Sequence, residues 1–236
     1  MTALIPEGVK HRIKDRLGVP SMESGLLGLR ANGFAPKVVL DIGAYQGEWT
    51  MLCKRIWPAC SALMLEAAPA RMPKLKRLAS TLGGVETQQA LLGPSPRPYV
   101  PFYEQESASS VLPESAKAGQ YSIDLSMQTL DEAIRDTAFA APDFLKLDVQ
   151  GYELEVLKGG RKALKSAEAA LLEVNLLQIY EGAPLLHEAL CFMANEGFRA
   201  YDVCTLYRRP LDHALWQMDM IFVRDDSPLV GSKRYE

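Results

Sequence analysis

Cysteine is scarce in this sequence: there are four in 236 residues, and no two of them form a C-x-x-C pair. Zinc sites and disulfide frameworks need cysteines at characteristic spacings, so the sequence argues against both. We therefore expect free thiols, as is typical of a protein in the reducing cytoplasm. The cysteines are Cys53, Cys60, Cys191 and Cys204.

Long apolar runs and an excess of one charge are also missing. No stretch approaches the roughly 18–20 apolar residues that a transmembrane helix needs, and residues 1–14 contain no continuous apolar segment of the kind found in secretory signals. The 26 Lys and Arg against 29 Asp and Glu leave a net charge of −3, which argues against a dedicated nucleic-acid binder. The sequence therefore predicts a cytoplasmic protein with no transmembrane segment and no nucleic acid as partner.

Glycine and proline, at 17 and 15 residues, are too few for a collagen-like or disordered chain. Instead, short β-branched runs alternate with longer segments of helical periodicity, which predicts one α/β domain over residues 1–236 with a mostly parallel sheet. Residues 1–35 are expected to be a helical segment, and the proline-rich residues 93–120 an inserted loop or cap region with short strands. The expected strands are 37–41, 61–65, 85–92, 122–128, 143–148, 169–174, 198–204 and 217–224.

The first expected strand leads into the motif D-x-G-x-x-x-G, formed by Asp41, Gly43 and Gly47. In an open α/β sheet, ligands bind beyond the carboxyl ends of the strands, and glycine there permits positive φ and close approach. A dinucleotide motif is excluded because Tyr45 stands where its second glycine would be, and no P-loop is present. The remaining pattern suits a nucleoside that carries an amino acid. Glu66, at the end of the second strand, could accept hydrogen bonds from its ribose diol.

Residues 39–47, together with 65–69, 129–131 and 143–153, resemble the FkbM-type family of class I S-adenosylmethionine-dependent methyltransferases, and the similarity runs from about residue 38 to 224. The resemblance implies a Rossmann-like, seven-stranded, mostly parallel sheet of order 3-2-1-4-5-7-6, flanked by helices, with the last strand antiparallel. It also implies S-adenosyl-L-methionine as cofactor, with Asp41 acting near its methionine end through water or backbone groups. The expected cofactor-binding residues are Asp41, Gly43, Ala44, Tyr45, Gln46, Gly47, Glu66, Ala67, Ala90, Ser110 and Asp148.

Asp148, at the end of the fourth core strand, is the first candidate for the base that a hydroxyl acceptor needs. Glu173 and His213 are the next candidates. Lys146 shares a strand face with Asp148, so either a structural ion pair or a functional role is open for it. Asp219 interrupts an apolar strand and must also have a specific partner. Asp148 and Glu173 could alternatively provide oxygen ligands for Mg²⁺.

The resemblance points to O-methylation of a hydroxyl group, above all on a sugar of a glycolipid, oligosaccharide or glycosylated natural product. Methylation of a non-sugar secondary metabolite at oxygen or nitrogen stays open, as does a non-catalytic module that binds S-adenosylmethionine. The expected partner is a small-molecule or glycan acceptor, whose anionic groups Arg208 and Arg209 could hold. Formation of a homo-oligomer is left open by the sequence.

Overall fold

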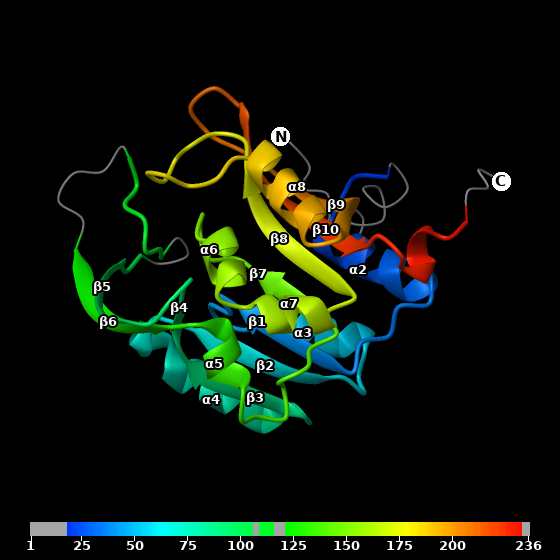
Figure 1. Ribbon diagram of the computed structural model, residues 1–236, viewed down its shortest axis with the longest axis horizontal. Helices are drawn as coiled ribbons and strands as arrows, with labels where there is room; N and C mark the ends of the chain where they lie inside the picture. The colour runs from blue at the N-terminus through cyan, green and yellow to red at the C-terminus, as the bar shows by residue number, and fades with distance from the viewer. Residues whose placement is uncertain (1–17, 106–108, 116–120, 233–236) are drawn as a thin grey trace, which may run out of the picture.

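The computed structural model describes residues 18–105, 109–115 and 121–232. A seven-stranded sheet lies at its centre, in the order β3-β2-β1-β7-β8-β10-β9 (Figure 1). Five strands run parallel, and β10 runs antiparallel to both of its neighbours. This confirms the α/β class and the antiparallel last strand. The strands are β1 (Val38–Ile42), β2 (Ser61–Glu66), β3 (Val85–Gln89), β7 (Phe144–Leu147), β8 (Ala169–Asn175), β9 (Phe198–Arg208) and β10 (Leu215–Arg224).

The single strand expected over residues 85–92 is wrong. β3 ends at Gln89, and after Ala90 the chain enters a second sheet of three strands, ordered β4-β6-β5. These strands are β4 (Leu91–Leu92), β5 (Arg97–Tyr103) and β6 (Ser122–Gln128). The strand labels in the main sheet therefore differ from the expected order; counted without the second sheet, its strands run 3-2-1-4-5-7-6.

Helices cover both faces of the main sheet (Figure 1). α2 (Met22–Ala31), α3 (Glu48–Ile56) and α4 (Met72–Thr81) bury side chains in one apolar core, which the aromatic ring of Phe144 joins from the sheet. The other core contains side chains of α5 (Leu130–Ile134), α6 (Glu153–Lys158), α7 (Arg161–Ser166) and α8 (Leu186–Asn195). Because successive strand residues point to opposite faces, a sheet covered on both sides needs nearly continuous apolar strands, as found in β1, β2 and β8.

The second sheet has an apolar cluster of its own. It consists of Ala68, Leu91, Val100, Phe102 and Met127. The inserted region expected over residues 93–120 thus contributes β5 to a packed sheet rather than only short strands and loop. Of the segment expected to be helical, 1–35, residues 22–31 form α2, and residues 1–17 lie outside the described residues. No helix within the described ranges is long and apolar enough to cross a membrane.

Candidate functional site

The turn after β1 brings the backbone of one strand end against that of another. Gly43 has a φ of +75°, and a Cβ added to it would lie 1.9 Å from the carbonyl oxygen of Asp148, so only glycine fits. The N–H of Gly43 donates to Leu65 O at 2.9 Å, which ties the turn to the end of β2. Gly47, with a φ of +85°, is the N-cap residue directly before α3. The D-x-G-x-x-x-G motif therefore forms a tight turn at the carboxyl edge of the sheet, as predicted.

Asp41 lies beneath this turn and does not line the cavity above it. Its carboxylate is fully buried, accepts a hydrogen bond from Thr50 Oγ1 at 2.6 Å and lies 3.2 Å from Lys146 Nζ. Lys146 also donates to Gly43 O at 2.9 Å. Burial alone would lower the pKa of Lys146, but the charges of Asp41 and Asp148 outweigh burial and raise it. Asp41 thus acts on the turn through Lys146, and its part in donor binding stays a prediction.

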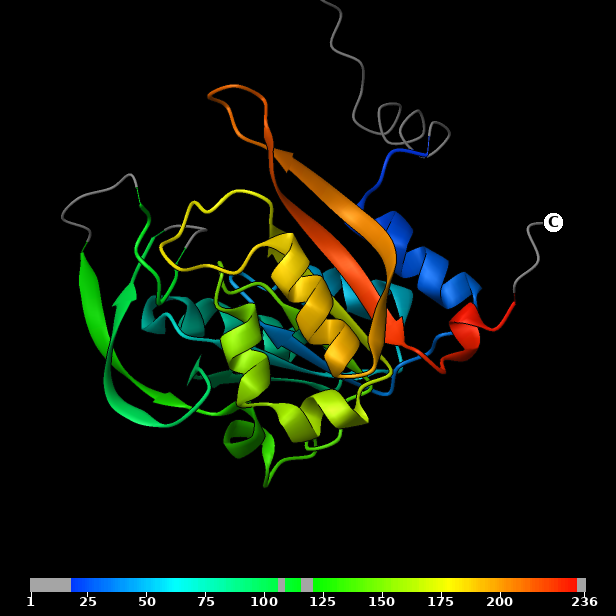
Figure 2. The same cartoon turned by 45° about the horizontal axis from the view of Figure 1, so that its top comes forward.

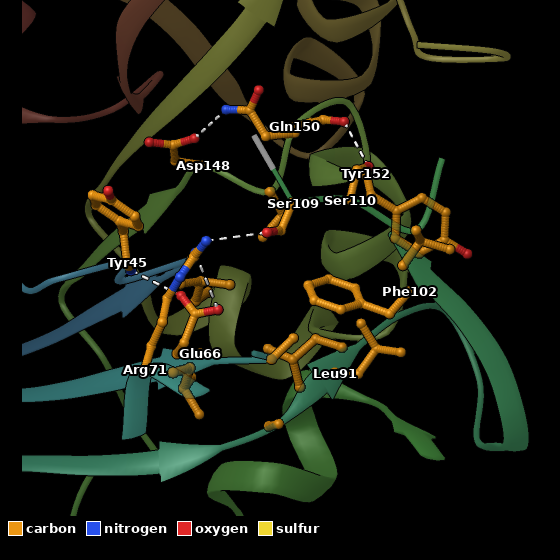
Figure 3. Close-up of a pocket in the computed structure, with 18 residues that line it drawn as sticks. Tyr45, Glu66, Arg71, Leu91, Phe102, Ser109, Ser110, Asp148, Gln150 and Tyr152 are labelled. Carbon is orange, nitrogen blue, oxygen red and sulfur yellow. Dashed lines mark hydrogen bonds and ion pairs between the residues drawn. The ribbon is translucent and has the colours of Figure 1, made fainter. Parts of the chain in front are cut away.

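A cavity opens above the turn (Figure 3). One side of it is apolar and the other carries polar and charged groups. Of the expected cofactor-binding residues, seven line it: Gly43, Tyr45, Glu66, Ala67, Ala90, Ser110 and Asp148. Ala44 and Gly47 are buried outside the lining, and the side-chain oxygen of Gln46 accepts a bond from Lys74. The apolar residues of the lining include Ile42, Leu65, Leu91, Leu92, Phe102 and Val111.

Glu66 closes the bottom of the cavity at the end of β2. Its Oε2 accepts the N–H of Tyr45 at 2.8 Å, and its Oε1 accepts the N–H of Ala68 at 2.9 Å. Burial raises the pKa of this carboxyl group, while the two N–H groups and the charge of Arg71 oppose the rise. The carboxylate is therefore fixed in direction and still has lone pairs for a ligand, since an ionised carboxylate can accept about four hydrogen bonds.

Asp148 and Glu173 are joined by a residue whose role the sequence did not reveal. The Gln150 amide donates to Asp148 Oδ1 at 2.8 Å and to Glu173 Oε2 at 2.7 Å, and its own oxygen accepts the hydroxyl of Tyr180 at 2.9 Å. Gln150 reaches this position from a φ of +56°. The carboxylate of Asp148 is 36% exposed and lies 3.5 Å from Lys146 Nζ, so its ionised form has a countercharge.

Glu173 has a different environment, although it belongs to the same network. Burial, and then the charges of Asp148 and Glu153, raise the pKa of Glu173 well above its usual range. It is buried and does not line the cavity. The two candidate bases are therefore brought together, but they differ: Asp148 faces the cavity, and Glu173 lies behind it as the group that retains a proton.

The third candidate, His213, is separate from this network. It is exposed in the turn between β9 and β10, with a φ of +59°, and Figure 2 shows this hairpin projecting beyond the rest of the sheet. Arg209 pairs with Asp212 at 2.5 Å, and Arg208 donates to His213 O at 3.0 Å. Both arginines expected to hold an acceptor thus stabilise their own turn. Asp219 finds its specific partner in the Tyr207 hydroxyl, which donates to it at 3.2 Å.

The magnesium site considered for Asp148 and Glu173 is not formed. Within the described ranges, no group of three or more His, Cys, Asp or Glu side chains is arranged to hold a metal ion. The N–H groups of Gln150 lie between the two carboxylates, in the place that a shared cation would need.

The strand order of the main sheet and a cavity beyond the carboxyl ends of β1, β2 and β7 agree with the Rossmann-like fold that the sequence implied for a class I methyltransferase. The chain belongs to the FkbM methyltransferase family, because the profile of the methyltransferase FkbM domain matches residues 41–200.

Two relatives illustrate the similarity. Methyltransferase sdnD of Sordaria araneosa is 28% identical over 153 residues, a match that covers 51% of this chain and 59% of the relative. The crystal structure of methyltransferase FkbM from Methylobacillus flagellatus KT shares the fold, with a TM-score of 0.52 and 19% identity over 80% of this chain and 43% of that one. The chain thus spans less than two thirds of the length of either relative.

Proposed function

We propose that this protein transfers a methyl group from S-adenosylmethionine to a hydroxyl group of a small-molecule or glycan acceptor, above all a sugar. One observation carries the proposal: Glu66, whose direction is fixed by two N–H groups, and Asp148, a carboxylate with a countercharge, line the same cavity. Glu66 suits the ribose of the donor, and Asp148 suits the acceptor hydroxyl. A cytoplasmic location and a homo-oligomer stay predictions.

The residues of the cavity fit S-adenosylmethionine. Its apolar side offers Leu91 and Phe102 to a flat base, and Glu66 has acceptor positions for the two ribose hydroxyls. The absence of a side chain at Gly43 lets the turn lie against the carbonyl of Asp148, so that both residues line the same cavity. When bound, S-adenosylmethionine supplies a methyl group already activated by the positive sulfur.

The protein must then position the acceptor and take up its proton. A hydroxyl group titrates far above neutral pH, so a base beside it favours the attack. Asp148 is the better candidate, because its carboxylate is partly exposed, lines the cavity and lies 3.5 Å from Lys146 Nζ. Glu173 is buried outside the cavity lining, and burial raises its pKa well above the usual range. The Gln150 amide keeps Asp148 in one orientation, and such positioning itself contributes to the rate.

A labelled-methyl transfer assay tests the proposal. Wild-type protein and Asp148→Asn are incubated with labelled S-adenosylmethionine and a panel of glycosides, glycolipid extracts, aromatic alcohols and amines, each with and without a chelator. We expect labelled glycoside with the wild type, and a rate lower by about 10²–10⁴-fold with Asp148→Asn at unchanged donor affinity. Label only on amines, or donor binding without transfer to any acceptor, would contradict the proposal; the latter would favour a non-catalytic binding module.

A further inference from the structure

Arg71 lines the cavity and, among the described residues, contacts three separate parts of the chain (Figure 3). It ends the short helix η1 (Pro69–Arg71), five residues after Glu66. Its Nη1 is 3.6 Å from Glu66 Oε1, and its guanidinium carbon lies 4.5 Å from the centre of the Tyr45 ring. Its Nη2 donates to Gln105 O at 2.6 Å and to Ser109 Oγ at 3.1 Å. These contacts hold a long side chain in one place, so its charge has a defined position.

Glu66 needs such a charge because it is almost completely buried. Burial favours the protonated form of a carboxyl group, and a protonated Glu66 would have less capacity to accept hydrogen bonds. A ribose diol donates two hydrogen bonds to a carboxylate. The donor site therefore requires Glu66 in its ionised form.

Arg71 can stabilise the negative charge of Glu66 without occupying the acceptor positions that a ligand needs. The N–H groups of Tyr45 and Ala68 occupy about two of the roughly four acceptor positions of Glu66. At 3.6 Å, the contact with Arg71 is an ion pair rather than a hydrogen bond, so the arginine acts through its charge. The remaining acceptor positions are left for the two hydroxyls of a ligand.

We propose that Arg71 is the positioning residue of the donor site: it keeps Glu66 ionised and aimed into the cavity, and it connects that carboxylate to Ser109, which lines the same cavity. This inference rests on the proposed function, because it takes a nucleoside with an intact 2′,3′-diol as the ligand of Glu66. Arg71 acts through Glu66, and its removal weakens binding only of ligands that carry the diol.

Calorimetric titration of the full chain tests this with two probes, S-adenosylhomocysteine and its 2′,3′-dideoxy analogue. The variants are Arg71→Met, Arg71→Lys and the control Arg77→Met, which changes an exposed arginine on α4. Loss of the Arg71 charge should raise the pKa of Glu66. At pH values below that pKa, Arg71→Met should bind S-adenosylhomocysteine more weakly, by about tenfold for each pH unit by which the pKa rises, and the difference should fade at higher pH. Arg71→Met should bind the dideoxy analogue as the wild type does. Arg77→Met should leave both affinities unchanged.

The pH dependence of binding distinguishes an effect of the Arg71 charge from an effect of the shape of its side chain. The charged groups that face Glu66 are Arg71 and, farther away, Lys146, and both lower its pKa. Affinity for S-adenosylhomocysteine should fall as Glu66 takes up a proton at low pH. In Arg71→Met the fall should occur at higher pH, and Arg71→Lys should return it toward the wild-type position.

The outcomes are distinguishable. Equal weakening for both probes in Arg71→Met, or an unshifted pH profile, would overturn the inference while the wild type still bound its donor. No binding of S-adenosylhomocysteine by the wild type would overturn the proposed function and the inference with it. Thermal unfolding of each variant identifies loss of fold, and Arg71→Lys retains the test if Arg71→Met does not fold.

Discussion

Replacing Lys146 by methionine should destabilise the whole protein, because it leaves Asp41 as a buried carboxylate without a countercharge. Asp41 is 0% exposed, and its Oδ1 lies 3.2 Å from Lys146 Nζ. Removing one partner from a buried ion pair costs about 3–5 kcal/mol. For a chain of this size, 1 kcal/mol corresponds to roughly 2–4 °C in Tm. We therefore expect Lys146→Met to lower Tm by roughly 6–20 °C.

The double variant Asp41→Asn/Lys146→Met should recover much of this loss, since it removes both charges and keeps an oxygen that can accept from Thr50. The assay is urea and thermal unfolding of the wild type, both single variants and the double variant. Lys158→Met is the matched control, because its partner Glu155 forms a surface pair with it, worth about 1 kcal/mol or less. If Lys146→Met were as stable as Lys158→Met, the argument that Asp41 needs a buried countercharge would be refuted.

Gly43→Ala should abolish donor binding, because its Cβ would lie 1.9 Å from Asp148 O at a φ of +75°; wild-type affinity for S-adenosylmethionine in calorimetry would contradict this. Tyr180→Phe should lower kcat severalfold at unchanged donor affinity, since the Gln150 amide loses the hydroxyl that fixes its orientation, and an unaltered kcat would count against that role. The free energy of unfolding should decrease by up to about 3 kcal/mol as pH rises from about 4.5 to 7, because burial raises the pKa of Glu153 to about 7 and ionisation of the folded state is then unfavourable. Glu153→Gln should make the dependence of stability on pH less steep in this range and leave the part caused by the raised pKa values of Glu173 and Asp219; an equally steep dependence in urea unfolding would count against a role for Glu153.

The features that could be predicted from the sequence depend on short stretches of chain. The alternation of short β-branched runs with segments of helical periodicity identified the parallel strands. The D-x-G-x-x-x-G motif located Gly43 at the carboxyl edge of the sheet. The position of Glu66 followed from the end of the second strand. Once the strand order was implied by the family resemblance, Asp148 could be placed at the same edge as Asp41, and the structure has them on the neighbouring strands β7 and β1.

The features that could not be predicted depend on which distant side chains meet. Asp41 was expected to act near the donor through water or backbone groups, and that role stays a prediction. The register of β1 with β7 places Lys146 next to Asp41, and no local pattern signals their ion pair. Gln150 and Tyr180 are thirty residues apart, and no local pattern signals their bond. Residues 85–92 contain no glycine or proline to mark the break at Ala90, so nothing in this stretch signals it.

The chain leaves the main sheet at Ala90, so the two walls of the cavity belong to two different sheets. Glu66 and Gly43 are held by the register of β1 with β2, whereas Leu91 and Phe102 belong to β4 and β5, which pair only through β6. A change in the length of the β5–β6 hairpin would reshape the second wall and leave the first in register. The contact with the base of the donor would therefore change with that hairpin, while the contacts of Glu66 and of the turn at Gly43 stayed the same.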